Sequence, residues 1–224
     1  MRSASSTELT LQQGSFVAIL GTNGCGKSTL ASLISRLYDV DSGSVCVGGK
    51  DVREYDLDSL RNEVAMVLQK NVLFSGTITE NLRWVDESAD MEAIMTVASD
   101  AQAADFIAAF PEQYETSLSQ GGVNVSGGQK QRVSIAGVLA MHPKCIILDE
   151  PTAGLDPKER VRFRNLIAEL GKDCIVLLST HIVSDIEHIA DEVLMMKDGQ
   201  LIYQGVWDES NGDLEKFYLS QFEE

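Results

Sequence analysis

The chain has 224 residues, 44% of them hydrophobic, and a formal net charge of −16, which suits one large domain, or one domain with an inserted subdomain, around a substantial core. The acidic balance argues against a nucleic-acid partner, because nucleic-acid binding needs a basic face that displaces counterions from phosphates. The apolar runs fall short of the roughly 18 residues of a membrane span and the N-terminus lacks a secretion signal, so we expect the chain neither to cross a membrane nor to enter secretion by itself.

The first predicted elements flank a glycine-rich loop. Residues 8–20 alternate weakly around Gly14 and end in a β-rich stretch, which predicts a strand, a turn and a buried strand. Residues 30–37 have the apolar spacing of a helix. Between the buried strand and this helix lies a segment whose spacing fits the phosphate-binding pattern G-x-x-x-x-G-K-S/T: Gly21, Thr22, Asn23, Gly24, Cys25, Gly26, Lys27, Ser28 and Thr29.

The residue types of this segment suit a bound phosphate chain. Glycine permits positive φ angles and lets backbone N–H groups approach an anion, and the start of the following helix adds attraction. Lys27 would reach the β- and γ-phosphates, and the Ser28 hydroxyl would hold a Mg²⁺ position. The alternative is an ordinary glycine-rich turn.

The next segments are short, and a helical region follows them. Turn residues around position 41 lead into a hairpin centred on Gly48-Gly49, a short helix over 58–61 and a buried strand over 64–68 that ends at Gln69. From Asn71 to about Met141 the pattern becomes largely helical. We therefore expect one domain over residues 1–224, with an α/β core (1–69 and 142–224) and an inserted helical subdomain (70–141).

Strands and helices alternate again in the last third of the chain. The predicted elements are a helix over 130–140 ended by Pro143, a strand over 145–148, a helix over 157–170, a strand over 174–178, a helix over 182–190, strands over 192–196 and 201–203, and a short amphipathic helix over 214–219. In an open parallel sheet, ligands bind beyond the carboxyl ends of the strands. Gly21, Gln69, Asp149 and His181 should therefore converge on one edge.

Polar residues at the ends of the apolar strands suit phosphate chemistry. Asp149 follows four apolar residues, as expected of a carboxylate that holds Mg²⁺. Glu150 could orient or deprotonate an attacking water, and its side chain should point away from that of Asp149 because neighbouring strand residues face opposite sides. His181 could donate to a γ-phosphate. The alternatives are surface charge for the two carboxylates and a structural role for His181.

The four cysteines, Cys25, Cys46, Cys145 and Cys174, have no close pairing spacing. We expect reduced thiols in a cytosolic protein and no disulfide or structural metal. Cys25 lies within the glycine-rich segment, where it is either a small filler residue or a thiol whose alkylation blocks nucleotide binding.

Over essentially its whole length the sequence resembles the nucleotide-binding domain of ABC transporters. Six segments match the family's motifs in the family's order: Gly21 to Thr29 (Walker A), Gln69 (Q-loop), Val125 to Gln129 (the signature usually written LSGGQ), Cys145 to Glu150 (Walker B), Ala153 to Asp156 (D-loop) and His181 (switch histidine). The resemblance implies a P-loop NTPase (RecA-like) core with a parallel sheet, a small antiparallel β region and an inserted helical subdomain.

The resemblance also implies a function. It implies ATP and Mg²⁺ as cofactors, with Glu150, His181, Gln69 and Lys27 as catalytic residues. Ser28, Gln69 and Asp149 would hold the metal. Ser126, Gly127, Gly128 and Gln129 would contact an ATP bound to a second nucleotide-binding domain, and Asp156 would belong to the D-loop at that interface. The implied partners are this second domain and the transmembrane domains of a transporter, at the cytoplasmic face of the cell membrane.

The direction of transport is predicted from the branches of the family that individual segments resemble. Residues 67–82 and 120–131 are similar to exporters with fused membrane and ATPase domains, whereas 148–205 are closer to stand-alone ATPase subunits, so we expect an exporter-like domain of mosaic character. The family's adenine-stacking aromatic would lie upstream of Met1, and we therefore expect weak ATP binding with little adenine preference. The alternatives are a soluble ABC protein acting on ribosomes or DNA and a weakly active or non-catalytic nucleotide-binding module.

Overall fold

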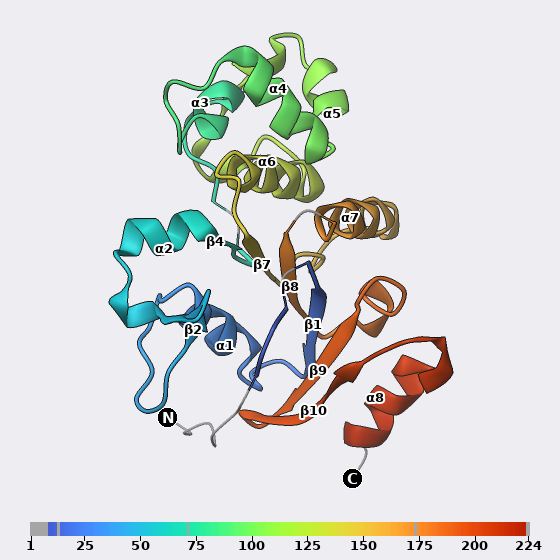
Figure 1. Ribbon diagram of the computed structural model, residues 1–224. Helices are drawn as coiled ribbons and strands as arrows, with labels where there is room; N and C mark the ends of the chain where they lie inside the picture. The colour runs from blue at the N-terminus through green and yellow to red at the C-terminus, as the bar shows by residue number, and fades with distance from the viewer. Residues whose placement is uncertain (1–8, 13, 71, 173, 223–224) are drawn as a thin grey trace.

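A computed structural model describes residues 9–12, 14–70, 72–172 and 174–222. Its centre is a six-stranded sheet with the strand order β10-β9-β1-β8-β7-β4 (Figure 1). All neighbouring strands are parallel except β10, which runs antiparallel to β9. This confirms the predicted α/β class with a mainly parallel sheet. The strands are β1 (Phe16–Gly21), β4 (Val64–Val67), β7 (Cys145–Asp149), β8 (Ile175–Thr180), β9 (Glu192–Lys197) and β10 (Gln200–Val206).

The central strands are apolar throughout because both faces of the sheet are covered. Every residue of β1 and of β7 is buried, which is typical of parallel strands between two layers of helices. Alternate residues enter different cores: Ala18 and Leu20 belong to one hydrophobic cluster, Val17 and Ile19 to the other.

Different elements cover the two faces. Helix α1 (Lys27–Ile34), helix α2 (Leu57–Glu63) and the hairpin of β2 (Cys46–Val47) and β3 (Lys50–Asp51) pack on the Val17 and Ile19 side. Helix α7 (Pro157–Leu170) and helix α8 (Leu214–Phe222) pack on the Ala18 and Leu20 side. The site at the strand ends therefore rests on a sheet that is held from both faces.

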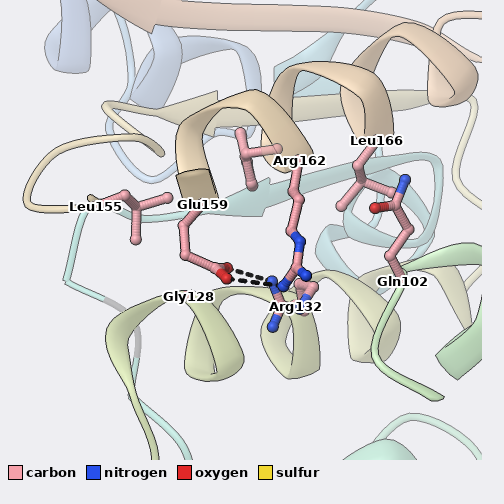
Figure 2. A pocket seen from close by; sticks show the side chains of 8 residues that line it. Gln102, Gly128, Arg132, Leu155, Glu159, Arg162 and Leu166 are labelled. Carbon is pink, nitrogen blue, oxygen red and sulfur yellow. Dashed lines mark hydrogen bonds and ion pairs between the residues drawn. The ribbon is translucent and has the colours of Figure 1, made fainter. Parts of the chain in front are cut away.

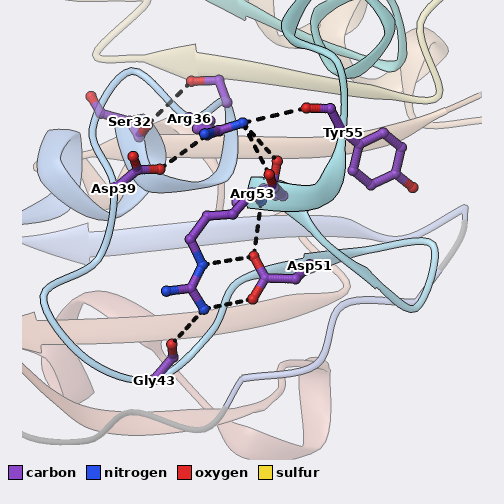
Figure 3. A network of polar contacts seen from close by, with 9 residues as sticks. Ser32, Arg36, Asp39, Gly43, Asp51, Arg53 and Tyr55 are labelled. Carbon is purple, nitrogen blue, oxygen red and sulfur yellow. Dashed lines mark hydrogen bonds and ion pairs between the residues drawn. The ribbon is translucent and has the colours of Figure 1, made fainter.

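A polar network fixes the hairpin beside α1 (Figure 3). The Arg36 guanidinium donates to the carbonyl oxygens of Val52 and Tyr55 at 3.3 and 3.4 Å. Arg53 and Asp51 form an ion pair at 2.7 Å, and the hydrogen bonds from Arg53 lower the pKa of Asp51 to about 2. Arg36, just after α1, thus holds the segment that follows the hairpin, and Arg53 braces the hairpin residue Asp51.

The helical region between β4 and β7 forms a cap on one end of the molecule, at the top of Figure 1, where the colour runs from teal through green to yellow. Its elements are β5 (Gly76–Thr77), α3 (Ile78–Leu82), α4 (Met91–Asp100), α5 (Ala104–Ala108), β6 (Ser117–Leu118) and α6 (Gly127–Leu139). A capping box of Thr77 and Glu80 begins α3. The position of the predicted helices is confirmed, while the division into a core and a separate subdomain stays a prediction.

Short 3-10 helices complete the chain. They are η1 (Val52–Glu54), η2 (Gln113–Glu115), η3 (Gln120–Gly122), η4 (Val183–Asp185) and η5 (Glu209–Asn211). Within the described ranges, no helix combines the length and the apolar character needed to cross a membrane.

Two predicted elements are wrong. Residues 9–12 form no strand, and residues 8 and 13 lie outside the described residues. The helix expected over 182–190 is only η4 followed by turns. Tertiary contacts compete with helix formation there, because the buried Asp185 accepts a hydrogen bond from Thr152 and Arg164 donates to the carbonyl oxygen of Ser184 at 2.7 Å.

The four cysteines are free thiols of unequal reactivity. Burial raises the pKa of the Cys145 thiol to about 12, because the thiolate is poorly solvated there. Thiols react through their thiolates, so at pH 8 we expect exposed Cys46 to be alkylated by iodoacetamide and Cys145 to stay unmodified until the protein is denatured. Peptide mass spectrometry checks this. Equal labelling of both in the native protein would contradict the burial of β7.

Candidate nucleotide-binding and catalytic site

The glycine-rich segment, residues 21–29, is called the phosphate loop here, and it joins β1 to α1. Gly24 and Gly26 have φ angles of +80° and +110°, which are left-handed values that a Cβ disfavours. A Cβ at Gly21 would lie 2.5 Å from the Cys25 sulfur and from the Met196 carbonyl oxygen. All three glycines are therefore required by the backbone itself.

The exposed part of the phosphate loop is polar. Thr22, Asn23, Gly24, Ser28 and Thr29 are exposed. The side chain of Cys25 is buried within the core under β1, which favours its role as a small filler residue. The loop thus offers backbone and hydroxyl groups to a ligand from its outer side.

Lys27 points back across the loop. Its ammonium group donates to the carbonyl oxygens of Gly21 at 2.8 Å and Thr22 at 3.2 Å and forms an ion pair with Glu150 at 3.1 Å. Lys27 and Glu150 are only 4% and 6% exposed. The predicted phosphate-binding cation and the predicted base are therefore direct neighbours.

Asp149 lies at the end of β7 among hydroxyl groups. Its Oδ1 atom accepts hydrogen bonds from Ser28 Oγ at 2.9 Å and from Ser179 Oγ. A carboxylate and hydroxyl oxygens are the hard donors that Mg²⁺ prefers. The structure thus brings together Ser28 and Asp149, two of the three residues predicted to hold the metal.

Glu150 directly follows β7, and its backbone leaves the strand conformation, so the expectation from strand alternation does not apply to it. Its φ of +45° is left-handed, a conformation that costs non-glycine residues roughly 1–2 kcal/mol. The backbone N–H of Glu150 donates to the Ser179 carbonyl oxygen at 2.9 Å, which holds this turn. The side chain meets Lys27 at Oε1 and His181 at Oε2. Strained positions of this kind cluster at functional sites.

His181 follows β8 and contacts the base. Its Nδ1 atom lies 2.7 Å from Glu150 Oε2. A carboxylate has no donor when it is ionised, so an ionised Glu150 would accept this hydrogen bond from Nδ1–H. The exposed fraction of this side chain is 38%, so His181 can both orient Glu150 and reach outward.

Gln69 stands apart from this group. It follows β4, next to β7 in the sheet, and is exposed. In the described part of the chain its side chain makes no hydrogen bond to Asp149 or Ser28. Its place after β4 agrees with the predicted position at a strand end. Its role at the metal stays a prediction.

Residues Ser126 to Gln129, called the signature segment here, begin α6. Ser126 is the N-cap, with its Oγ accepting from Gln129 N–H at 3.2 Å and its own N–H donating to Gln129 Oε1 at 2.9 Å. Ser126 and Gly127 are exposed and Gly128 is buried. Among the described residues, no hydrogen bond or ion pair links this segment to the phosphate loop.

Asp156 is a helix cap as well as a predicted D-loop residue. Its Oδ1 accepts from the backbone N–H groups of Lys158 at 2.9 Å and Glu159 at 3.0 Å, and Pro157 occupies the first turn of α7. The exposed carboxylate therefore begins α7, independently of any partner.

We expect Asp156→Ala to lower the free energy of unfolding by about 1 kcal/mol, because two backbone donors lose their acceptor. Asp156→Asn keeps a side-chain oxygen at the N-cap and should stay close to the wild type. Urea denaturation of the three proteins measures the difference. Equal stability of the alanine variant would show that Asp156 does not cap the helix.

Ser179 was missed by sequence reasoning. Its hydroxyl binds Asp149, and the Glu150 N–H contacts both its carbonyl oxygen and, at 3.3 Å, its Oγ. The signal that identifies it is the order of the sheet, since β8 lies directly beside β7.

Comparisons with known proteins agree with this site. The family model described as ABC transporter matches residues 4–153. The chain is 45% identical over 201 residues to the putative multidrug export ATP-binding/permease protein YgaD of Bacillus subtilis (strain 168), covering 90% of this chain and 34% of that protein. It is 38% identical over 216 residues to a putative multidrug export ATP-binding/permease protein of Staphylococcus aureus (strain bovine RF122 / ET3-1), covering 95% of this chain and 37% of that protein.

A solved structure is similar over the same range. The structure described as a bacterial Atm1-family ABC exporter with ATP bound superposes with a TM-score of 0.83 at 32% sequence identity, covering 95% of this chain and 37% of that chain. The present chain thus spans about a third of the length of the relatives it matches. With the family model covering more than half of its residues, the chain belongs to the ABC transporter family.

Proposed function

We propose that this chain is the ATP-binding and ATP-hydrolysing domain of an exporter-type ABC transporter. The observation that carries the proposal is the contact of Lys27, Glu150 and His181, from three separate segments, beside the Ser28 and Asp149 pair. Such a cluster of buried charges at strand ends is costly unless it serves binding or catalysis. The names of the relatives favour export.

The phosphate loop and Lys27 would bind the phosphate chain of ATP. Ser28, Asp149 and Gln69 would hold Mg²⁺, which neutralises charge on the phosphates when it is bound. Glu150 would accept a proton from the attacking water, and His181 would keep the Glu150 carboxylate in place. Lys27, hydrogen-bonded to the loop and ion-paired with Glu150, would keep the base near the phosphates.

The signature segment would complete the site of a second copy or a related chain. Ser126 and Gly127 present a hydroxyl and backbone N–H groups at the start of a helix, an arrangement that attracts anions. Since no hydrogen bond or ion pair in the described part of the chain links this segment to its own phosphate loop, a head-to-tail pair would let each ATP contact both kinds of segment. If the two chains are identical, such an interface is isologous.

An exposed apolar patch would contact the transmembrane domains. The rings of Phe74 and Trp84 stack with centroids 4.1 Å apart and are 48% and 65% exposed, and Leu68, Val72 and Val85 beside them in sequence are also exposed. Exposed apolar patches of this kind mark interaction surfaces. The chain would then lie at the cytoplasmic face of the cell membrane, held there by this partner.

Phosphate release from ATP by the purified chain tests the proposal. We expect hydrolysis with Mg²⁺ and none with excess EDTA, and we expect Ser28→Ala to need more Mg²⁺ for the same rate because a ligand is lost. Ser134→Ala, on α6 away from the strand ends, is the matched control. A protein that binds ATP but does not hydrolyse it at any Mg²⁺ concentration would overturn the proposal and favour a non-catalytic nucleotide-binding module.

A further inference from the structure

The two glycines of the signature segment have different surroundings. A Cβ at Gly127 would meet only the Leu155 Cδ2 atom, at 3.8 Å. A Cβ at Gly128 would lie 2.3 Å from Glu159 Oε2, 2.9 Å from its Cδ and 3.1 Å from its Cγ. Gly128 is therefore glycine because the Glu159 side chain of α7 occupies the space beside it, within the same chain.

Glu159 is held in this place by two arginines (Figure 2). Its Oε2 pairs with Arg132 of α6 and its Oε1 with Arg162 of α7 at 3.1 Å. Arg132 is only 7% exposed, and its guanidinium also lies 5.1 Å from the ring centre of Phe106 on α5. Because a buried arginine without its carboxylate is costly, Glu159 cannot simply swing away.

Glu159 also belongs to the capped start of α7. Its backbone N–H donates to Asp156, the N-cap, at 3.0 Å. The Arg132 and Glu159 pair thus joins the first two turns of α6 to the first turn of α7. The Arg132 and Glu159 side chains therefore connect the helix that begins with the signature segment to the helix that Asp156 caps.

We propose that Glu159 is a positioning residue: it holds α6 against α7, and thereby sets where Ser126 and Gly127 stand relative to Asp156. The inference rests on the proposed function, in which these residues meet an ATP bound to a second copy. Arg132 is its partner, and the absent side chain of Gly128 makes the room. Glu159 itself contacts no nucleotide.

A double-mutant cycle of Gly128→Ala and Glu159→Ala tests the proposal, read by ATP-dependent dimerisation of the full chain. Glu159→Ala should weaken dimerisation by about tenfold, within the two- to hundredfold range that contacting pairs show. Gly128→Ala should cost as much in the wild-type background and almost nothing more in the Glu159→Ala background. ATP binding at the phosphate loop, measured by titration at low protein concentration, should change less than about twofold in every variant.

Two controls sharpen the result. Arg162→Ala removes only the outer ion pair and should dimerise like the wild type. Gly127→Ala should cost the same with or without Glu159, because its Cβ does not meet that side chain. Equal costs of Gly128→Ala in both backgrounds, or normal dimerisation of Glu159→Ala, would overturn the positioning role.

The same cycle read by urea unfolding keeps this inference separate from the proposed function. A wild-type protein that does not dimerise with ATP would overturn the proposed function and with it the effect on the second copy. The unfolding cycle would still decide whether Glu159 holds Gly128 and Arg132. Additive unfolding effects would contradict the contact itself.

Discussion

Glu150→Gln is expected to lower the ATP turnover of this chain by about 10²- to 10⁴-fold, the range that general-base catalysis contributes. The glutamine amide has nearly the shape of the carboxylate, but it has one acceptor oxygen where the carboxylate has two, and it cannot accept a proton from water. ATP binding should persist, because the phosphate loop is unchanged. Phosphate release under single-turnover conditions separates the chemical step from binding.

The matched control for this substitution is Glu169→Gln. Glu169 lies on α7 with a side chain that is 67% exposed and paired with Lys172, so turnover should equal that of the wild type. If Glu150→Gln hydrolyses ATP at the wild-type rate while binding it, Glu150 is not the base. The surface-charge interpretation of this carboxylate would then stand.

Lys27→Met is expected to lower the free energy of unfolding by about 3–5 kcal/mol, even without nucleotide, because it leaves the buried Glu150 carboxylate without its cation. Methionine keeps most of the lysine's apolar stem, so the loss reports the charge. Adding Glu150→Gln removes the unpaired charge, and the double variant should recover most of the lost stability.

Urea denaturation of the wild type, both single variants and the double variant measures this coupling. The cycle isolates the pair if each substitution removes the interaction without adding another. His181 remains beside residue 150 in all four proteins and acts as a common background. Additive effects, with no recovery in the double variant, would show that Lys27 and Glu150 are not bonded in solution.

The order of the elements could be predicted because the parallel strands read as continuous apolar runs between turn residues. The strand ending at Asp149 and the helix from Pro157 to Leu170 have boundaries that agree closely with the prediction. The helix expected over 182–190 failed because apolar spacing there serves packing around a buried Asp185 rather than one face of a helix. Sequence spacing alone does not distinguish these cases.

The candidate site could be predicted in part for the same reason. Strand ends in a parallel sheet share one edge, so Gly21, Gln69, Asp149 and His181 were expected to converge there. Lys27 and Glu150 link Gly21 to His181, whereas the convergence of Gln69 stays a prediction. Ser179 could not be identified without the strand order. The contact of Glu159 with Gly128 could not be foreseen, because the two residues lie on different helices and are 31 positions apart in the sequence.

The central claim, that ATP is shared between two copies, is tested most directly by sedimentation velocity of Glu150→Gln with and without ATP and Mg²⁺. The account predicts a monomer without nucleotide and a dimer with it, and predicts that the wild-type dimer disappears as ATP is consumed. A Glu150→Gln protein that is saturated with ATP yet sediments as a monomer at every protein concentration would contradict it.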